Sequence, residues 1–282
     1  MKLSLLNRFQ YCLQGACLTA QPDTLKAIAA MTPHLSFGKS LSLTDWQDLT
    51  TPEQIWVVLI PLMLFYHDCP AAFYQQLRLL QMNQWLNPSE TEAIALIFQI
   101  MSLILRERFD PRRDLVSNLA CLSDFWKFDF ENGEAFWLSA MLEKLTTAIA
   151  DHLSLYQVRQ SLFPPQSEQE APGLALYCWL DSPDHFSLSW QRAKVTQNPL
   201  AIILTGTLSG AYNGGVGMPA NESLTFESQP LETLLGKLSQ NLYYRWSGGQ
   251  SPDLNRPQPV TTAPLVMQRR LGLKLISQCE YQ

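Results

Sequence analysis

The chain has 282 residues, of which 46% are hydrophobic, enough for one large domain or two small ones. Only 16% of the residues are charged, the net charge is −5 and no basic run occurs, so we expect no nucleic-acid binding. The six cysteines are scattered and form no CxxC pair, which favours buried thiols in a cytoplasmic protein over disulfides or zinc ligands.

The apolar segments argue against membrane insertion. The N-terminus, MKLSLLNRFQYCLQG, breaks its apolar run with polar residues and differs from a signal peptide. The most apolar run, residues 55–66, is shorter than the ~20 residues that a membrane-spanning helix needs. We therefore expect a soluble, cytoplasmic protein without a membrane span.

Apolar residues at helical spacing predict helices through most of the chain. Capping boxes predict helix starts at Thr51–Gln54, with Pro52 at the first helical position, and at Ser89–Glu92. Residues 123–132 and 220–229 are expected to be loops, although the aromatic alternation of the first is also compatible with a short strand. The predicted helices cover residues 3–18, 24–31, 51–66, 70–85, 89–109, a stretch after 110, and then 134–162, 173–180, 182–195, 199–213 and 230–246.

Asn198 to Pro219 is the central stretch of the chain. Asn198 and Pro199 are typical of a helix start, and the glycines from Gly214 onward, with Pro219, end the helix. Gly206 and Gly210 lie four residues apart inside it, although each glycine costs a helix ~1 kcal/mol against alanine. This spacing predicts a groove on one helix face in which a neighbouring helix approaches closely.

The same stretch, with PGLALYCWLDSPDHFSLSW before it, resembles the C-terminal part of the ADP-ribosylglycohydrolase family. Its helix matches the family form GxLxGAYxG followed by proline, and the matched positions include Gly206, Gly210, Tyr212, Gly214 and Pro219. The resemblance implies an all-α, single-domain orthogonal multi-helix bundle over residues 1–246. Residues 247–282 are expected to form a C-terminal tail, because the first part of this range, up to Pro264, is rich in Gly, Pro and Ser.

The resemblance also implies a two-magnesium site, but its ligands are missing. The family's Gly-Asp-Thr-Asp-Thr turn is replaced by residues 196–200, with Gln197 and Pro199 in place of the aspartates. Two further ligand motifs are degenerate as well, and Glu53 is their one remaining carboxylate. Magnesium needs mostly carboxylate ligands, so we expect no metal and no cofactor here. The degenerate positions are Thr19, Ala20, Thr51, Pro52, Glu53, Gln197 and Pro199.

Other polar groups are weaker candidates. Asp181, Asp184 and His185 cluster before the central helix, where carboxylates also commonly cap helices. Arg192 or Lys194 could replace the metal as an anion clamp. The four histidines show no ligand spacing, and neither a GxSxG elbow nor a phosphate-binding loop is present.

Three functions remain open at the level of sequence. The first is a non-catalytic relative, a pseudoenzyme that binds an unknown protein or a nucleotide-like ligand. The second is an active hydrolase of ADP-ribosyl N- or O-glycosidic bonds with altered metal ligands, for which Glu53 is the weak catalytic candidate. The third is a structural subunit of an assembly. We expect the first, and therefore no enzymatic activity.

Overall fold

The structure is a computed structural model that describes residues 3–18, 28, 52–107, 110–111, 136–163, 167, 170–219, 225–226 and 229–248. Within these ranges, the side chains of residues 52–53, 136–140, 225–226 and 229–230 are not described. The predictions for a helix at 24–31, a helix after 110, a loop at 123–132 and a tail after 248 lie outside the described residues.

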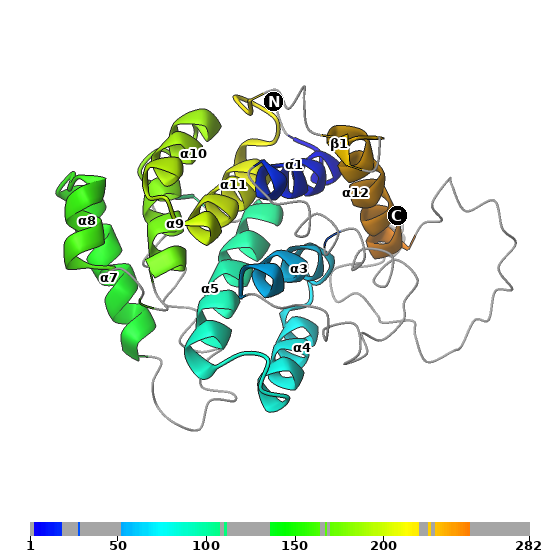
Figure 1. Ribbon diagram of the computed structural model, residues 1–282. Helices are drawn as coiled ribbons and strands as arrows, with labels where there is room; N and C mark the ends of the chain where they lie inside the picture. Colours follow the sequence, from blue (N-terminus) through cyan, green and yellow to red (C-terminus); the bar gives the residue numbers. More distant parts are fainter. Residues whose placement is uncertain are drawn as a thin grey trace, which may run out of the picture.

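The described chain is all-α, as predicted, apart from one short strand pair (Figure 1). The strands β1 (Thr225–Phe226) and β2 (Gln229–Pro230) pair antiparallel in a segment predicted to be a loop. The helices are α1 (Leu5–Cys17), α3 (Pro52–Phe65), α4 (Pro70–Met82), α5 (Pro88–Leu105), α7 (Phe136–Ala150), α8 (Leu155–Ser161), α9 (Glu170–Leu180), α10 (Phe186–Val195), α11 (Pro199–Asn213) and α12 (Leu231–Ser247).

Most of the observed helix boundaries differ from the prediction by a few residues, and two of the differences have a clear local cause. The helix predicted to start at Ser89 is capped by Asn87, whose side chain accepts from the backbone of Glu90 while Glu90 accepts from the backbone of Asn87. The single helix predicted for 134–162 is two helices, because His152 adopts a φ of 50° and turns the chain. Ser154 then caps α8 with a capping box of its own. A residue in the left-handed conformation cannot continue a right-handed helix. The helix is therefore interrupted at His152, although the apolar residues keep their helical spacing on both sides of it.

Helices α1 and α11 lie side by side at the centre of the molecule and run in opposite directions (Figure 1). Gly15 lies against Gly206, Tyr11 against Gly210, and Leu3 against Gly214. The predicted groove is therefore confirmed, and its occupant is the N-terminal helix. Helices α9 and α10 cover another side of α11, and α12 packs on α1.

Each of the described helices, from α1 to α12, contributes residues to the hydrophobic core. Helix α5 is buried along most of its length, and Phe98 stacks on Phe73 of α4 with ring centroids 3.9 Å apart. Among the described residues, α5 is the one helix long and apolar enough to cross a membrane, and 72% of its 18-residue window is buried inside the fold. Such burial is what a core helix shows.

Candidate functional site

The turn from Thr196 to Pro199, where the resemblance implies a metal-binding motif, uses its own polar groups to start α11. The Thr196 hydroxyl donates to the Ala193 carbonyl at 2.6 Å and accepts from the Asn198 backbone N–H at 3.2 Å. The Asn198 side chain accepts from the Ala201 backbone N–H at 3.0 Å and caps the helix. Each of these side-chain oxygens thus forms hydrogen bonds with backbone groups, as the side chains of capping residues do.

The two substituted positions in this turn do not fit a magnesium ion. Gln197 is exposed, with a φ of 55°, and Pro199 occupies the first helical position without any side-chain oxygen. Magnesium is held chiefly by carboxylates, and this turn has none. Among the described residues, no group of three or more His, Cys, Asp or Glu side chains is placed to hold a metal ion.

The remaining ligand positions are described only in part. Thr19, Ala20 and Thr51 lie outside the described residues. Pro52 and Glu53 lie in the first turn of α3, which begins at Pro52 as the sequence predicts, but their side chains are not described. The role of Glu53 therefore stays a prediction.

The matched scaffold residues hold the C-terminal half of α11. Gly214, with a φ of 61°, ends the helix, and its N–H donates to Gly210 at 2.9 Å. Tyr212 packs edge-to-face on Trp179 of α9 at 5.9 Å. Arg8 of α1 donates to the carbonyl oxygens of Ala211 and Tyr212 at 3.0 and 3.3 Å, which complements the negative end of the helix. Pro219 is half-buried at the end of this described segment.

The two proposed anion clamps are both engaged elsewhere. Lys194 lies over the ring of Trp190, with its ammonium nitrogen 4.6 Å from the ring centroid. Arg192 forms an ion pair with Asp181, and its Nη1 also donates to the Ser182 hydroxyl at 3.2 Å. Asp181 is therefore the partner of a guanidinium rather than a helix cap. The N-cap of α10 is His185, whose side chain makes no capping bond.

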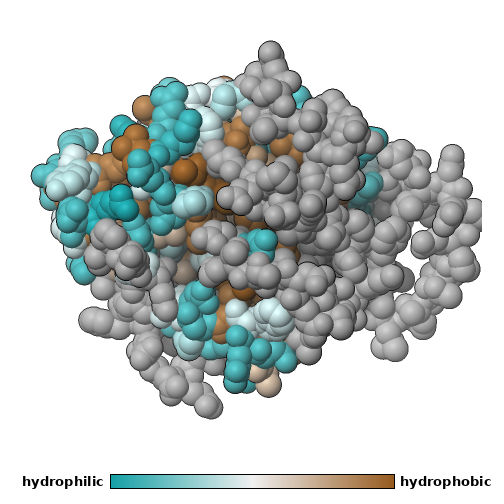
Figure 2. All heavy atoms as spheres, viewed as in Figure 1, coloured by the Kyte–Doolittle hydropathy of each residue, from teal (hydrophilic) through white to brown (hydrophobic). Residues whose placement is uncertain are grey.

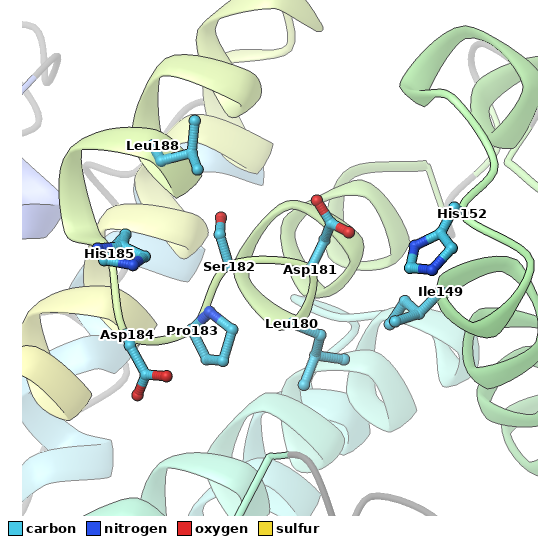
Figure 3. A pocket seen from close by; sticks show the side chains of 9 residues that line it. All are labelled: Ile149, His152, Leu180, Asp181, Ser182, Pro183, Asp184, His185 and Leu188. Atoms are coloured by element: carbon cyan, nitrogen blue, oxygen red, sulfur yellow. The ribbon is translucent and has the colours of Figure 1, made fainter.

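Beside this ion pair lies a hollow of about 360 Å³ between the α7–α8 turn and the α9–α10 turn (Figure 3). Figure 3 shows His152 and His185 on opposite sides of it, with Leu180 and Pro183 between them. Asp181, Asp184 and His185, grouped by the sequence, are thus brought together at one site. The lining residues are Ile149, His152, Leu180, Asp181, Ser182, Pro183, Asp184, His185 and Leu188.

A chain of buried hydroxyls supports the Asp181–Arg192 pair. Ser189 is fully buried, and its hydroxyl donates to the Ser182 carbonyl at 2.7 Å. The hydroxyls of Ser182 and Ser189 lie 3.0 Å apart, so Ser182 accepts from Arg192 and donates to Ser189. Because every member has a partner, the network fixes the position of Arg192, and through it the Asp181 carboxylate.

Two further bonds tie the walls of the hollow to the core. The Tyr177 hydroxyl of α9 donates to the carbonyl of Leu153, the residue after His152. Asn213, at the end of α11, donates to the carbonyl of Pro183 at 2.7 Å. Burial raises the pKa of Tyr177, while the positive charge of Arg192 opposes that rise. The phenol thus keeps its proton and remains a donor.

Sequence reasoning missed two features of this hollow. His152 and Ile149 belong to a helix end far from Asp181 along the chain, and no pattern in the sequence indicates the Asp181–Arg192 pair. A useful signal was available near His152, since the capping box that begins at Ser154 starts two residues after it. Comparison of the chain with protein-family models, curated proteins and solved structures finds no match.

Proposed function

We propose that the protein is a non-catalytic relative of the ADP-ribosylglycohydrolases that acts by binding a protein or a ligand. The observation that carries the proposal is the closed turn from Thr196 to Pro199. Where the family has two aspartates, this turn has Gln197 and Pro199, and its remaining oxygens cap α11. The proposed relation to the family rests on the sequence resemblance. The argument against hydrolytic activity rests on this turn, which lacks the carboxylates that would hold the metal ions.

Two further features support the proposal. The helix with the family form begins at Pro199 and ends at Gly214, and its glycines lie against α1. The cations that were candidates to replace the metal, Arg192 and Lys194, are engaged with Asp181 and Trp190. An ADP-ribose diphosphate would thus meet no metal-holding turn, and the Arg192 guanidinium is already paired with a carboxylate.

A calorimetric titration tests the proposal. Magnesium chloride is titrated into the protein with and without ADP-ribose, and an active ADP-ribosylglycohydrolase serves as the positive control. We expect no saturable magnesium heat. A saturable heat that vanishes in Glu53→Gln would contradict the proposal and make Glu53 a surviving ligand. Co-purification of a fixed-stoichiometry partner under native conditions would instead indicate a structural subunit.

A further inference from the structure

Two histidines line the hollow with imidazoles that bond nothing in the described part of the chain. His152 turns the chain between α7 and α8, and His185 precedes α10 without capping it. Both residues are exposed, and neither side chain has a hydrogen-bond partner among the described residues. Figure 3 shows the two rings on opposite sides of the hollow. A neutral imidazole has one donor and one acceptor nitrogen, so each side offers a hydrogen bond of either kind.

The surface between the two imidazoles is apolar. Leu180 and Pro183 are buried and lie between the histidines in Figure 3. Ile149 lies on the α7 side, and Leu188 on α10 is 42% exposed. Figure 2 shows hydrophobic residues among hydrophilic ones on the face over α9 and α10. Mostly apolar walls with a few polar groups are typical of small-molecule sites, and the volume of about 360 Å³ is near the lower end of their ~300–1,000 Å³.

The carboxylates of the hollow already have partners. Asp181 is paired with Arg192, and Asp184 has an interaction of its own. Of the described residues that line the hollow, none is lysine or arginine. A ligand cation would therefore have to compete with existing partners, and a ligand anion would find no cation in the lining. Because an ion loses hydration on entering an apolar site, the hollow favours an uncharged ligand.

We propose that this hollow binds a small uncharged molecule that carries a hydroxyl group at each end of an apolar middle. One hydroxyl bonds the His152 imidazole and the other bonds the His185 imidazole, while the middle packs on Leu180 and Pro183. A hydroxyl suits both ends, because it donates and accepts and so fits either nitrogen of the ring. The inference rests on the proposed function, since it names the ligand class of a binding protein.

The primary test compares two pairs of isomers in mildly alkaline buffer, where imidazoles are ordinarily neutral. The hydroxyls stand at opposite ends of p-benzenedimethanol and 1,6-hexanediol, but at one end of o-benzenedimethanol and 1,2-hexanediol. Affinity is measured by calorimetry, and the NMR signals of the histidine rings report the place of binding. We expect the end-to-end isomers to bind about three- to tenfold tighter, because the others leave one imidazole without a partner. Terephthalate and p-xylylenediamine carry charges at the two ends of the same ring, and we expect both to bind more weakly than p-benzenedimethanol.

Two variants place the binding in the hollow. His152→Gly removes one imidazole and suits a backbone with a φ of 50°, which glycine adopts readily. His185→Ala removes the other imidazole from an exposed position. Each variant is expected to weaken the end-to-end diols about three- to tenfold, and to affect the other isomers less because they can still use the remaining imidazole. Gln240→Ala removes an exposed polar side chain from α12, on the other side of the molecule (Figure 1), and serves as the matched control.

Melting temperatures confirm that the variants fold, and His185→Ala decides the matter if His152→Gly does not. The inference is overturned if neither end-to-end diol binds more tightly than its isomer, if a charged analogue binds more tightly than p-benzenedimethanol, or if diol affinity is unchanged in His185→Ala. Hydrolysis of ADP-ribosylated substrates would overturn the proposed function but not diol binding, and failure of diol binding would leave the proposed function intact.

Discussion

Gly15 of α1 and Gly206 of α11 lie backbone against backbone. A Cβ atom added to Gly15 would stand 2.0 Å from the Gly206 carbonyl oxygen, and one added to Gly206 would stand 2.2 Å from the Gly15 carbonyl oxygen. Real side chains do not approach backbone atoms this closely, so neither residue can be replaced without separating the helices. The contact sets the distance between two segments that are remote in sequence.

Gly206→Leu is therefore expected to lower the free energy of unfolding by several kcal/mol. Overpacking ordinarily costs ~1–3 kcal/mol, and here the obstacle is backbone that cannot change rotamer. Chemical denaturation followed by circular dichroism measures the effect. Gly236→Ala on α12 is the matched control, because its added Cβ meets only the end of Gln10 at 3.9 Å. That variant is expected to gain up to ~1 kcal/mol of helix propensity. Equal free energies of unfolding for Gly206→Leu and wild type would contradict the close approach of α1 and α11 at Gly206.

Asn198 is expected to act as a helix cap rather than a metal ligand. Asn198→Ala removes the acceptor for the Ala201 N–H and should cost about 1 kcal/mol of unfolding free energy, whereas Asn198→Asp should retain the cap. Both variants are compared by urea denaturation with magnesium present and absent. A magnesium-dependent difference between them would speak against the capping role.

Alkaline pH is expected to destabilise the fold through its buried thiols. Burial raises the pKa of Cys12 and Cys17, and raises that of Cys178 to about 12. In the unfolded chain thiols ionise near ~8.5, so above that pH the unfolded state loses protons that the folded state keeps. The stabilisation is fully present below about pH 8.5 and falls by up to ~1.4 kcal/mol per pH unit for each thiol.

Urea denaturation across this pH range measures the effect, with Cys178→Ala as the comparison. Removing one thiol whose pKa is raised should make the free energy of unfolding fall less steeply with pH. Identical slopes for Cys178→Ala and wild type would mean that Cys178 ionises as easily in the folded protein as in the unfolded chain.

Removal of residues 250–282 is expected to leave the helical signal and cooperative unfolding nearly unchanged. The segment from Ser247 to Pro264 lacks apolar periodicity. The end of α12 is held without it, since the Trp246 indole donates to Asp68 at 3.1 Å and packs on His67 and Tyr243. An insoluble or molten truncation product would indicate that the residues from Leu265 to Ile276 complete the core.

The sequence predicts local structure well where a side chain acts on its own backbone. Asn198 and Pro199 predict the start of α11, and Gly214 predicts its end, because capping depends on residues within one turn. The two-residue error at α5 has the same origin. Ser89 and Asn87 both head a capping-box pattern, and the structure uses the one that places Pro88 at the first helical position.

Contacts between distant segments were beyond the sequence. Gly206 and Gly210 predict a close neighbour but do not identify it, since the pairing with Gly15 leaves no periodic signal. Of the residues that line the hollow, the sequence grouped only Asp181, Asp184 and His185, which belong to the α9–α10 turn. His152 lines the hollow because its own left-handed conformation turns the chain after α7. The sequence conceals this turn, since the apolar periodicity continues on both sides of it.

The most direct test of the central claim is release of ADP-ribose from ADP-ribosylated arginine and serine peptides with magnesium present. Wild type and Glu53→Gln are assayed beside an active ADP-ribosylglycohydrolase. The proposed function predicts no release above background by either protein, because the turn at Gln197 and Pro199 has no carboxylate to hold a metal ion that would activate water. Release by wild type that disappears in Glu53→Gln would contradict it.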